Sequence, residues 1–317
     1  MNKISNKNYL KKIIKEYAYS IGFNKVGFAK YRVLDEEIRN YQNWISNGFH
    51  ASMSYLERNI HKRYDLKQIL PEVESVIVFA HSYFTRIEHK SPFAKISRYA
   101  WGDDYHEILE KKLKLIVGYI SQHVPNLKCK IYVDTGPLLE KIWAVESGIG
   151  WQGKNSLVLS KELGSYFFIG IILTNIEFEA DTKVRDHCGS CVRCLQACPT
   201  GAIVQPKVID SRKCISFWTI EKKTWEEIPE DLNFKGWVFG CDICQEVCPW
   251  NSKAVMTNES KFLPRDSQTN LDEKTFEGLT PEVFKEKFRK SPVKRAKFEG
   301  IVKNYKHILR QRCAKID

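Results

Sequence analysis

The sequence predicts an α/β protein followed by a cysteine-rich part, and three observations support this. Strand-like and helix-like segments alternate over the first 180 residues, as they do when helices cover a sheet. Eight of the ten cysteines lie between positions 188 and 248. The end of the chain is basic and has helical periodicity. We therefore predict three consecutive parts: residues 1–180, a cysteine-rich part over 181–252, and a basic, mostly helical segment over 253–317.

The first part is expected to form a mixed α/β core. Apolar residues recur at helical spacing in some segments, and other segments are short runs of aliphatic and aromatic residues that predict strands. The helices are expected over 7–21, 34–46 and 105–122, and the strands over 26–29, 74–80, 130–134, 157–159 and 166–174. The turn at 135–137 ends in a proline, which can open a further helix.

The composition also bears on the compartment. The longest apolar run, residues 166–173, has eight residues, far fewer than the roughly 20 that cross a bilayer. The first residues, MNKISNKNYLKK, lack the apolar segment of a secretory signal. We therefore expect no membrane span and a cytosolic protein, in which clustered cysteines indicate metal or redox chemistry and not disulfides.

The cysteines follow the spacing of bacterial ferredoxins. The run Cys188-x2-Cys191-x2-Cys194-x3-Cys198-Pro199 has three ligands for one cluster and a fourth for a neighbouring cluster. The later run Cys241-x2-Cys244-x3-Cys248-Pro249 repeats its last three members, but Val238 stands where the first cysteine would be. Cys214 is the remaining cysteine of the segment, and we predict that it replaces the missing ligand.

Exchange of the fourth ligands then predicts two [4Fe-4S] sites. One has Cys188, Cys191, Cys194 and Cys248, and the other has Cys198, Cys214, Cys241 and Cys244. A pair of zinc sites is the alternative, since zinc also uses Cys-x2-Cys pairs, but zinc motifs do not require Cys-x3-Cys-Pro in both halves. Two neighbouring clusters form a path for single electrons.

The net charge of +12 points to an anionic partner. Residues 281–317 contain twelve Lys or Arg and four Asp or Glu, so eight of the twelve excess charges lie there. Either this segment has a solvated helical face, or it forms a surface for a phosphate backbone.

The first part also has a glycine-rich and polar region at strand ends, where pockets form. Asp134 follows a predicted strand directly. It is either the N-cap of the next helix or a proton donor.

Six motifs resemble the epoxyqueuosine reductase family, cobalamin-dependent iron-sulfur enzymes of tRNA queuosine synthesis. They are RYAWGDDYH at 98–106, DTGPLLEK at 134–141, SGIGWQGKNS at 147–156, CGSCVRCLQACPTGAI at 188–203, KCISFWTIE at 213–221 and GCDICQEVCPWN at 240–251. They occur in the family's order across most of residues 1–310. The sequence ends before the helical-repeat region that many members use to grip tRNA.

The resemblance implies a nitroreductase-like mixed-sheet domain that binds base-off cobalamin, packed on a ferredoxin-like double-cluster domain. It also implies reduction of epoxyqueuosine to queuosine at the tRNA wobble position, with loss of the epoxide oxygen as water. Asp134 matches the family's proton donor. For that role we expect a raised pKa, because burial disfavours the carboxylate.

Further site residues are carried over from the matched motifs. We expect corrin contacts from Ser97, Arg98, Asp134, Lys154, Asn155, Ser156, Ser216 and Asp242, although most of these residues suit turns or caps equally well. Tyr105 and His106 are expected near the active site or in the core. Lys222 and the basic C-terminal residues are expected to contact tRNA phosphates.

The expected partners are tRNA carrying epoxyqueuosine and a low-potential donor of the ferredoxin or flavodoxin type, and the protein is expected to be a monomer. Two other functions fit the motifs in part. A corrinoid reductase of a small molecule, such as a reductive dehalogenase, would have similar cofactors but no use for a basic segment. A ferredoxin-type carrier without catalysis would not need the motifs at 134–141 and 147–156.

Overall fold

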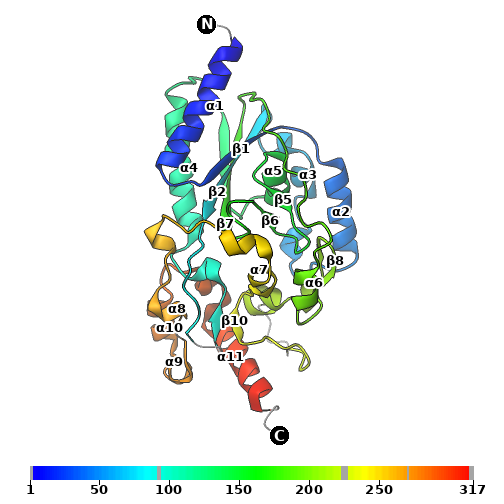
Figure 1. Ribbon diagram of the computed structural model, residues 1–317, viewed down its shortest axis with the longest axis vertical. Helices are drawn as coiled ribbons and strands as arrows, with labels where there is room; N and C mark the ends of the chain where they lie inside the picture. Colours follow the sequence, from blue (N-terminus) through cyan, green and yellow to red (C-terminus); the bar gives the residue numbers. More distant parts are fainter. Residues whose placement is uncertain (1–2, 91–93, 223–227, 270, 314–317) are drawn as a thin grey trace.

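The computed structural model describes residues 3–90, 94–222, 228–269 and 271–313. The molecule is elongated, with the N-terminus at one end and the C-terminus at the other (Figure 1). Sheet and long helices fill the N-terminal end, and short helices around α11 (Lys297–Cys313) fill the C-terminal end. In the described part of the chain, no helix combines the length and the apolar character that a bilayer span requires.

A four-stranded sheet forms the N-terminal half. Its order is β1 (Lys25–Lys30), β2 (Ser75–Ser82), β7 (Phe167–Thr174) and β4 (Cys129–Tyr132), and every neighbouring pair is antiparallel. The mixed sheet that we predict is therefore wrong for these four strands. The long connections between the strands allow either direction, so the sequence pattern could not decide it.

Helices cover both faces of this sheet. On one face, α1 (Lys3–Ser20) and α4 (Tyr105–Ser121) pack on Ile77 and Phe79 of β2. On the other face, Val76 and Val78 pack with α5 (Glu140–Glu146). This explains why β2 is apolar over residues 76–80 and buried at every residue.

The end of α5 lies directly against the first strand. A Cβ on Gly27 of β1 would lie 2.1 Å from the Ser147 carbonyl oxygen, so only glycine permits this approach. The predicted helix after Pro137 thus exists, but it begins at Glu140.

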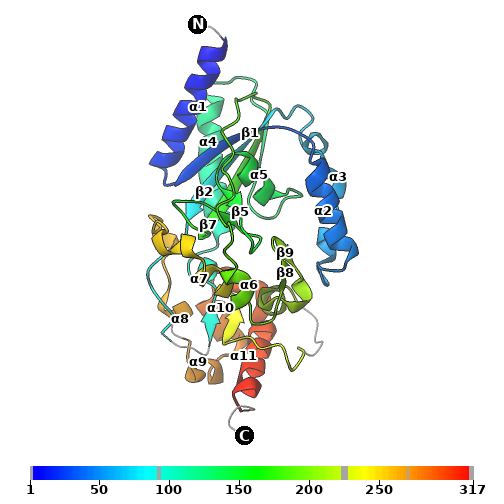
Figure 2. The same cartoon turned by 45° about the vertical axis from the view of Figure 1, so that its right-hand side comes forward.

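The remaining elements of the first half lie beside the sheet. α2 (Asp35–Ser46) and α3 (Ile60–Tyr64) form a separate layer, which the turned view separates from the sheet (Figure 2). β5 (Trp151–Gln152) and β6 (Val158–Leu159) form a short antiparallel pair. The predicted helices and strands of the first half are all present, with shifted ends.

The cysteine-rich part consists of short elements. α6 (Arg193–Ala197) and α7 (Ile243–Glu246) each lie within a cysteine run, and β8 (Ile203–Gln205) pairs with β9 (Val208–Ile209). Short turns of other helix types occur at Ser54–Leu56, Leu66–Gln68, Arg98–Ala100, Ser211–Lys213, Phe217–Glu221, Pro249–Lys253, Ser260–Phe262 and Pro292–Ala296.

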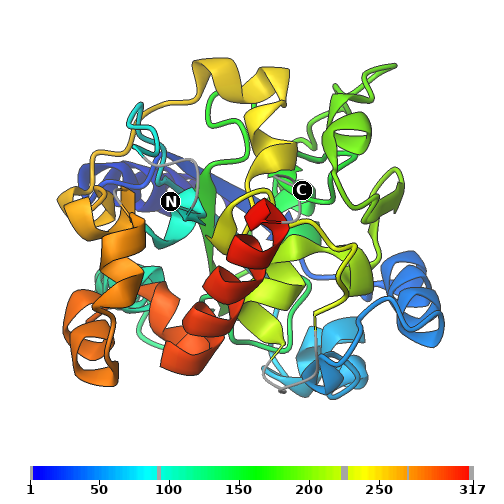
Figure 3. The same cartoon turned by 90° about the horizontal axis from the view of Figure 1, so that it is seen from below.

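A second core joins three distant segments. β3 (Lys95–Ile96) pairs in parallel with β10 (Trp237–Phe239), and Ile301 and Ile308 of α11 pack on this pair. Around them lie α8 (Asp266–Thr269), α9 (Glu273–Glu277) and α10 (Pro281–Lys287). Seen from below, α11 crosses the middle of this end of the molecule (Figure 3). The basic segment is therefore a packed part of the fold, and the three-part division of the chain stays a prediction.

Candidate active site and cluster-binding cysteines

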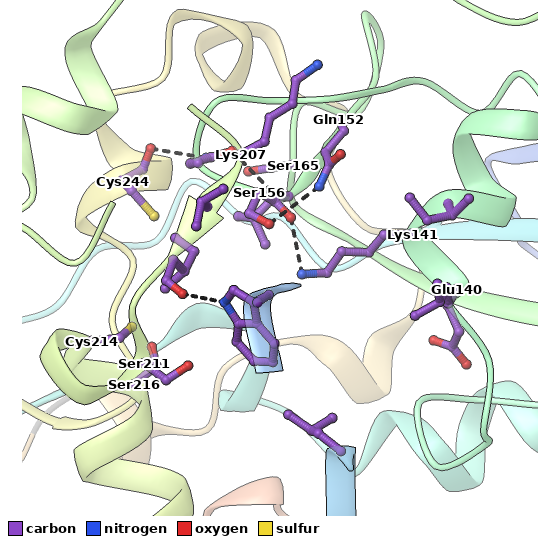
Figure 4. A pocket seen from close by; sticks show the side chains of 18 of the residues that line it. Glu140, Lys141, Gln152, Ser156, Ser165, Lys207, Ser211, Cys214, Ser216 and Cys244 are labelled. Atoms are coloured by element: carbon purple, nitrogen blue, oxygen red, sulfur yellow. Dashed lines mark hydrogen bonds between the residues drawn. The ribbon is translucent and has the colours of Figure 1, made fainter. Parts of the chain in front are cut away.

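A cavity of about 1800 Å³ lies between the sheet half and the cysteine-rich half. Its volume exceeds the roughly 300–1,000 Å³ of sites for drug-sized ligands, so it suits a large ligand. Glu140 and Lys141 lie on one side of it, and Cys214 and Cys244 on the other (Figure 4). Gln152, Ser156 and Ser165 lie between these two sides, and Ser211 and Ser216 lie beside Cys214.

Asp134 projects into this cavity from the turn after β4. Its φ of 60° is in the left-handed region, and its N–H donates to Glu140 Oε1 at 2.8 Å. Tyr105 donates its hydroxyl hydrogen to Asp134 Oδ2 at 3.0 Å, and His106 Nε2 lies 3.5 Å from the same oxygen. The N-cap interpretation is wrong, because the N-cap of α5 is Leu139. The start of α4 therefore holds the carboxylate.

His106 is also bound on its other side. Its Nδ1 lies 2.7 Å from Asp104 Oδ1, and Lys294 lies 3.1 Å from the second oxygen of Asp104. Burial alone would lower the pKa of His106, but hydrogen bonds to Asp104 and Asp134 raise it to about 9. The imidazole is therefore protonated at neutral pH and faces Asp134 as a cation.

The pKa of Asp134 moves opposite to our expectation. Burial raises the pKa of Asp134. The hydrogen bonds from His106 and Tyr105 and the charge of His106 lower it by more, so the pKa lies below the ordinary value. The predicted raised pKa is wrong because a cation from a different motif, the one at 98–106, lies 3.5 Å from the carboxylate. At neutral pH the proton of this pair is on His106.

Two residues that the sequence analysis did not single out complete this side. Burial and the nearby Asp134 raise the pKa of Glu140 to about 8. Burial lowers the pKa of Lys141, whose Nζ donates to the Ser156 carbonyl at 3.2 Å. Both residues belong to the motif at 134–141, so the strand-end position of that motif was the signal that could have identified them.

The C-terminal segment also reaches the cavity. Arg295 lines it and forms an ion pair with Glu221 at 2.8 Å. Tyr55, from the layer of α2 and α3, lies 3.4 Å from the same carboxylate. The lining of the large cavity thus combines residues from three distant segments.

The eight clustered cysteines separate into two groups. Cys198, Cys214, Cys241 and Cys244 line the large cavity, whereas Cys188, Cys191, Cys194 and Cys248 line a second cavity of about 380 Å³. Asn155 lines both cavities, so the two groups are neighbours. These are the two ligand sets that the spacing predicts. Val238, at the position of the missing cysteine, is fully buried in β10.

The thiols of one group influence each other. The pKa of Cys248 is raised by burial and by Cys188, Cys194 and Cys191, and the pKa of Cys244 by burial and by Cys241, Cys214 and Cys198. Among the described residues, no three His, Cys, Asp or Glu side chains converge closely enough for a single metal ion. A four-iron cluster is larger than one ion, and the two cavities offer it room.

The chain matches two family models. Residues 187–251 match a 4Fe-4S double cluster binding domain, and residues 63–135 match the model "Epoxyqueuosine reductase QueG, DUF1730". The epoxyqueuosine reductase of Atelocyanobacterium thalassa is 42% identical over 300 residues, which cover 92% of this chain and 97% of the relative. The one from Synechocystis is 43% identical over 268 residues, which cover 83% and 92%. The chain belongs to the epoxyqueuosine reductase family.

Solved structures of this family have the same fold. The enzyme of Bacillus subtilis is 30% identical with a TM-score of 0.86, over 95% of this chain and 81% of that one. An epoxyqueuosine reductase solved with an epoxyqueuosine-modified tRNA-Tyr stem loop is 31% identical with a TM-score of 0.87 and the same coverage. The double-cluster match also decides between iron-sulfur clusters and zinc in favour of the clusters.

Six of the eight predicted cofactor contacts line the large cavity. Ser97, Asn155, Ser156, Ser216 and Asp242 line the large cavity with Asp134. Within it, the Ser97 hydroxyl donates to Asp242 Oδ1 at 2.6 Å. Asp242 is fully buried, so this contact ties β3 to the second cysteine run.

The other two predicted cofactor contacts, Arg98 and Lys154, and the predicted tRNA contact Lys222 do not line the large cavity. Arg98 donates its guanidinium hydrogens to the carbonyls of Thr85 and Ile87 and is not part of the cavity lining. Lys154 donates to the Gly189 carbonyl at 2.7 Å and lines the second cavity. Lys222 lines neither cavity, and its ammonium lies 5.6 Å from the centre of the Trp218 ring.

The large cavity fits the cofactor that the resemblance implies. Cobalamin carries neutral amides around a broad corrin ring, and such groups need neutral donors and acceptors. Asn155, Ser156 and Ser216 provide them in a space large enough for the ring.

Proposed function

We propose that this protein reduces epoxyqueuosine to queuosine at the wobble position of tRNA, with cobalamin and two [4Fe-4S] clusters. One observation carries this proposal: Asp134, which lies 3.5 Å from His106, lines the same cavity as the cysteines of one cluster site. Because the chain belongs to the epoxyqueuosine reductase family, we infer that epoxyqueuosine is its substrate. Two electrons and two protons open the epoxide and release its oxygen as water.

The chain's own residues supply a proton. Asp134 faces the cavity as a carboxylate, with protonated His106 at 3.5 Å. A ligand that fills the cavity displaces water from Asp134, and loss of solvation favours the neutral acid. The proton then passes from His106 to Asp134 and on to the departing oxygen, while Asp104 keeps the imidazole in place.

Ser97, Asn155, Ser156, Ser216 and Asp242, together with Asp134, are the proposed contacts to cobalamin. When bound, cobalamin would supply an electron-rich cobalt that can open a strained C–O bond. Arg98 and Lys154 donate hydrogen bonds to backbone carbonyls. We propose that Arg98 supports the cavity wall and Lys154 the first cysteine loop, and that neither contacts the corrin.

The remaining partners are proposed from chemistry. The substrate is a tRNA, as in the relative solved with a modified stem loop, so we place the activity in the cytoplasm. Lys222 and exposed basic residues of α11 are candidate phosphate contacts. A ferredoxin or flavodoxin would supply electrons, and we propose a monomer. A reductase of small molecules is not favoured, because the curated relatives at about 40% identity are epoxyqueuosine reductases.

One assay tests the proposal. Protein is reconstituted anaerobically with iron, sulfide and cobalamin and mixed with a chemical reductant and epoxyqueuosine-containing tRNA. Nucleoside analysis should then detect queuosine. Absence of queuosine from fully loaded protein, with the tRNA bound, would contradict the proposal.

A further inference from the structure

The second cavity opens into a surface of unusual composition. Besides Cys188, Cys191, Cys194 and Cys248, its lining includes Lys154, Lys161, Arg193 and Lys253, and no Asp or Glu. Lys161, Arg193 and Lys253 are exposed. Lys25 nearby pairs with Glu162, whereas none of these three makes an ion pair with a described residue. Three positive charges at this cluster site therefore have no ion-pair partner among the residues that the structure describes.

Exposed aliphatic side chains lie beside these charges. Val192 is 38% exposed, and Val255 and Met256 are 45% and 51% exposed. Val255 donates its N–H to the Glu162 carbonyl, next to Lys161, and Val192 lies between Cys191 and Arg193. A mixture of apolar and charged groups is typical of protein interfaces. A phosphate backbone would use the charges but not the aliphatic groups.

The loop of the first cysteines also lies at the surface. Gly189 and Ser190 are exposed, and a Cβ on Gly189 would meet nothing within 4 Å. The large cavity is lined by Asp134, Tyr55 and Arg295. Seen from below, the yellow segment around α7 lies at the top and the light-blue segment before α3 lies at the lower right (Figure 3). Tyr55, Asp134 and Arg295 do not line the second cavity.

We propose that Lys161, Arg193 and Lys253, with Val192, Val255 and Met256, form the docking surface for an acidic, low-potential one-electron carrier protein. This inference rests on the proposed function. The carrier loses one electron at each encounter, and the cluster held by Cys188, Cys191, Cys194 and Cys248 gains it. Two encounters supply the two electrons of one turnover, and no bond to the carrier forms.

A binding experiment tests this surface without relying on turnover. The probe is an acidic flavodoxin, titrated by calorimetry into the protein loaded with both clusters. The variant K161E/R193E/K253E should bind it about tenfold more weakly or worse at low salt, and the salt dependence should diminish. The neutral variant K161Q/R193Q/K253Q should lie between the two. Iron content verifies that each variant retains its clusters.

The matched control carries the same charge change on the other half of the molecule. Lys12, Lys111 and Lys130 are exposed residues of α1, α4 and β4, and K12E/K111E/K130E should bind flavodoxin within about twofold of the parent. Equal weakening in both triple variants would overturn the proposal, because net charge alone would then explain it.

A second titration uses the modified tRNA stem loop. If K161E/R193E/K253E loses the stem loop but binds flavodoxin normally, the surface is an RNA site and the proposal is wrong. Conversion of tRNA with dithionite is measured separately. If the parent protein does not convert the tRNA in that assay, the proposed function is wrong. If flavodoxin binds K161E/R193E/K253E as tightly as it binds the parent, only the docking surface is wrong.

Discussion

His106 Nε2 lies 3.5 Å from Asp134 Oδ2, and this contact, together with the hydrogen bond from His106 to Asp104, favours the charged form of both His106 and Asp134. His106 keeps its proton at neutral pH because two carboxylates face its ring. Asp134 remains a carboxylate because the imidazolium and the Tyr105 hydroxyl stabilise its charge. At neutral pH the proton is therefore on His106, next to the Asp134 carboxylate that faces the cavity.

Asp134→Asn should abolish most of the turnover. The amide cannot deliver a proton, and loss of a general acid costs roughly 10²–10⁴-fold in rate. Cobalamin binding, followed by its visible spectrum, should be retained, because the other cavity contacts are unchanged. Full turnover of the variant with normal cobalamin binding would exclude Asp134 as the proton donor.

His106→Gln should change the pH dependence of the reaction. With a folded pKa of about 9, activity that needs protonated His106 falls as pH rises through about 9. The variant should lose roughly 10²-fold in rate and also lose this alkaline limb. A kcat/KM profile from pH 6 to 10 measures this, with Tyr105→Phe as the control that retains the limb.

The thermal stability of the protein should also depend on the protonation of His106. Because the pKa of His106 is raised from 6.5 to about 9 on folding, its contribution is fully present below about pH 6.5 and is lost as pH rises through about 9. His106→Gln should therefore show a smaller fall in Tm between pH 6.5 and 9 than the parent. An identical fall in both proteins would count against the ion pair.

Glu140 offers a matched pair of variants. Its carboxyl accepts the N–H of Asp134, whose φ is 60°, and its pKa of about 8 makes it mostly neutral at pH 7. Glu140→Gln retains an acceptor oxygen and should keep activity within about threefold at pH 7, whereas Glu140→Ala should lose about tenfold because the turn is released. Equal activities would indicate that Glu140 does not hold the turn.

Loss of one cysteine from each group should remove one cluster. Cys214→Ala and Cys248→Ala should each lower the iron content from about eight to about four per chain. Electron paramagnetic resonance of the reduced proteins should lose a different signal in each variant. Loss of the same signal from both would contradict the assignment of Cys214 and Cys248 to separate sites.

The sequence alone determined the elements and the chemistry of this protein. Apolar runs predicted β2 and β7, and helical spacing predicted α1, α2 and α4, because local periodicity reflects which face is buried. Cysteine spacing predicted the two groups into which the structure gathers the eight cysteines, including the distant Cys214, since the ferredoxin pattern lacks a cysteine at Val238.

Tertiary structure decided what depends on contacts between distant segments. Strand direction was undetermined because long connections permit both directions. The pairing of β3 with β10 joins residues about 140 positions apart, and no local signal encodes it. The pKa of Asp134 followed from His106, 28 positions earlier in the chain, because ionisation responds to distance in space and not to distance along the sequence.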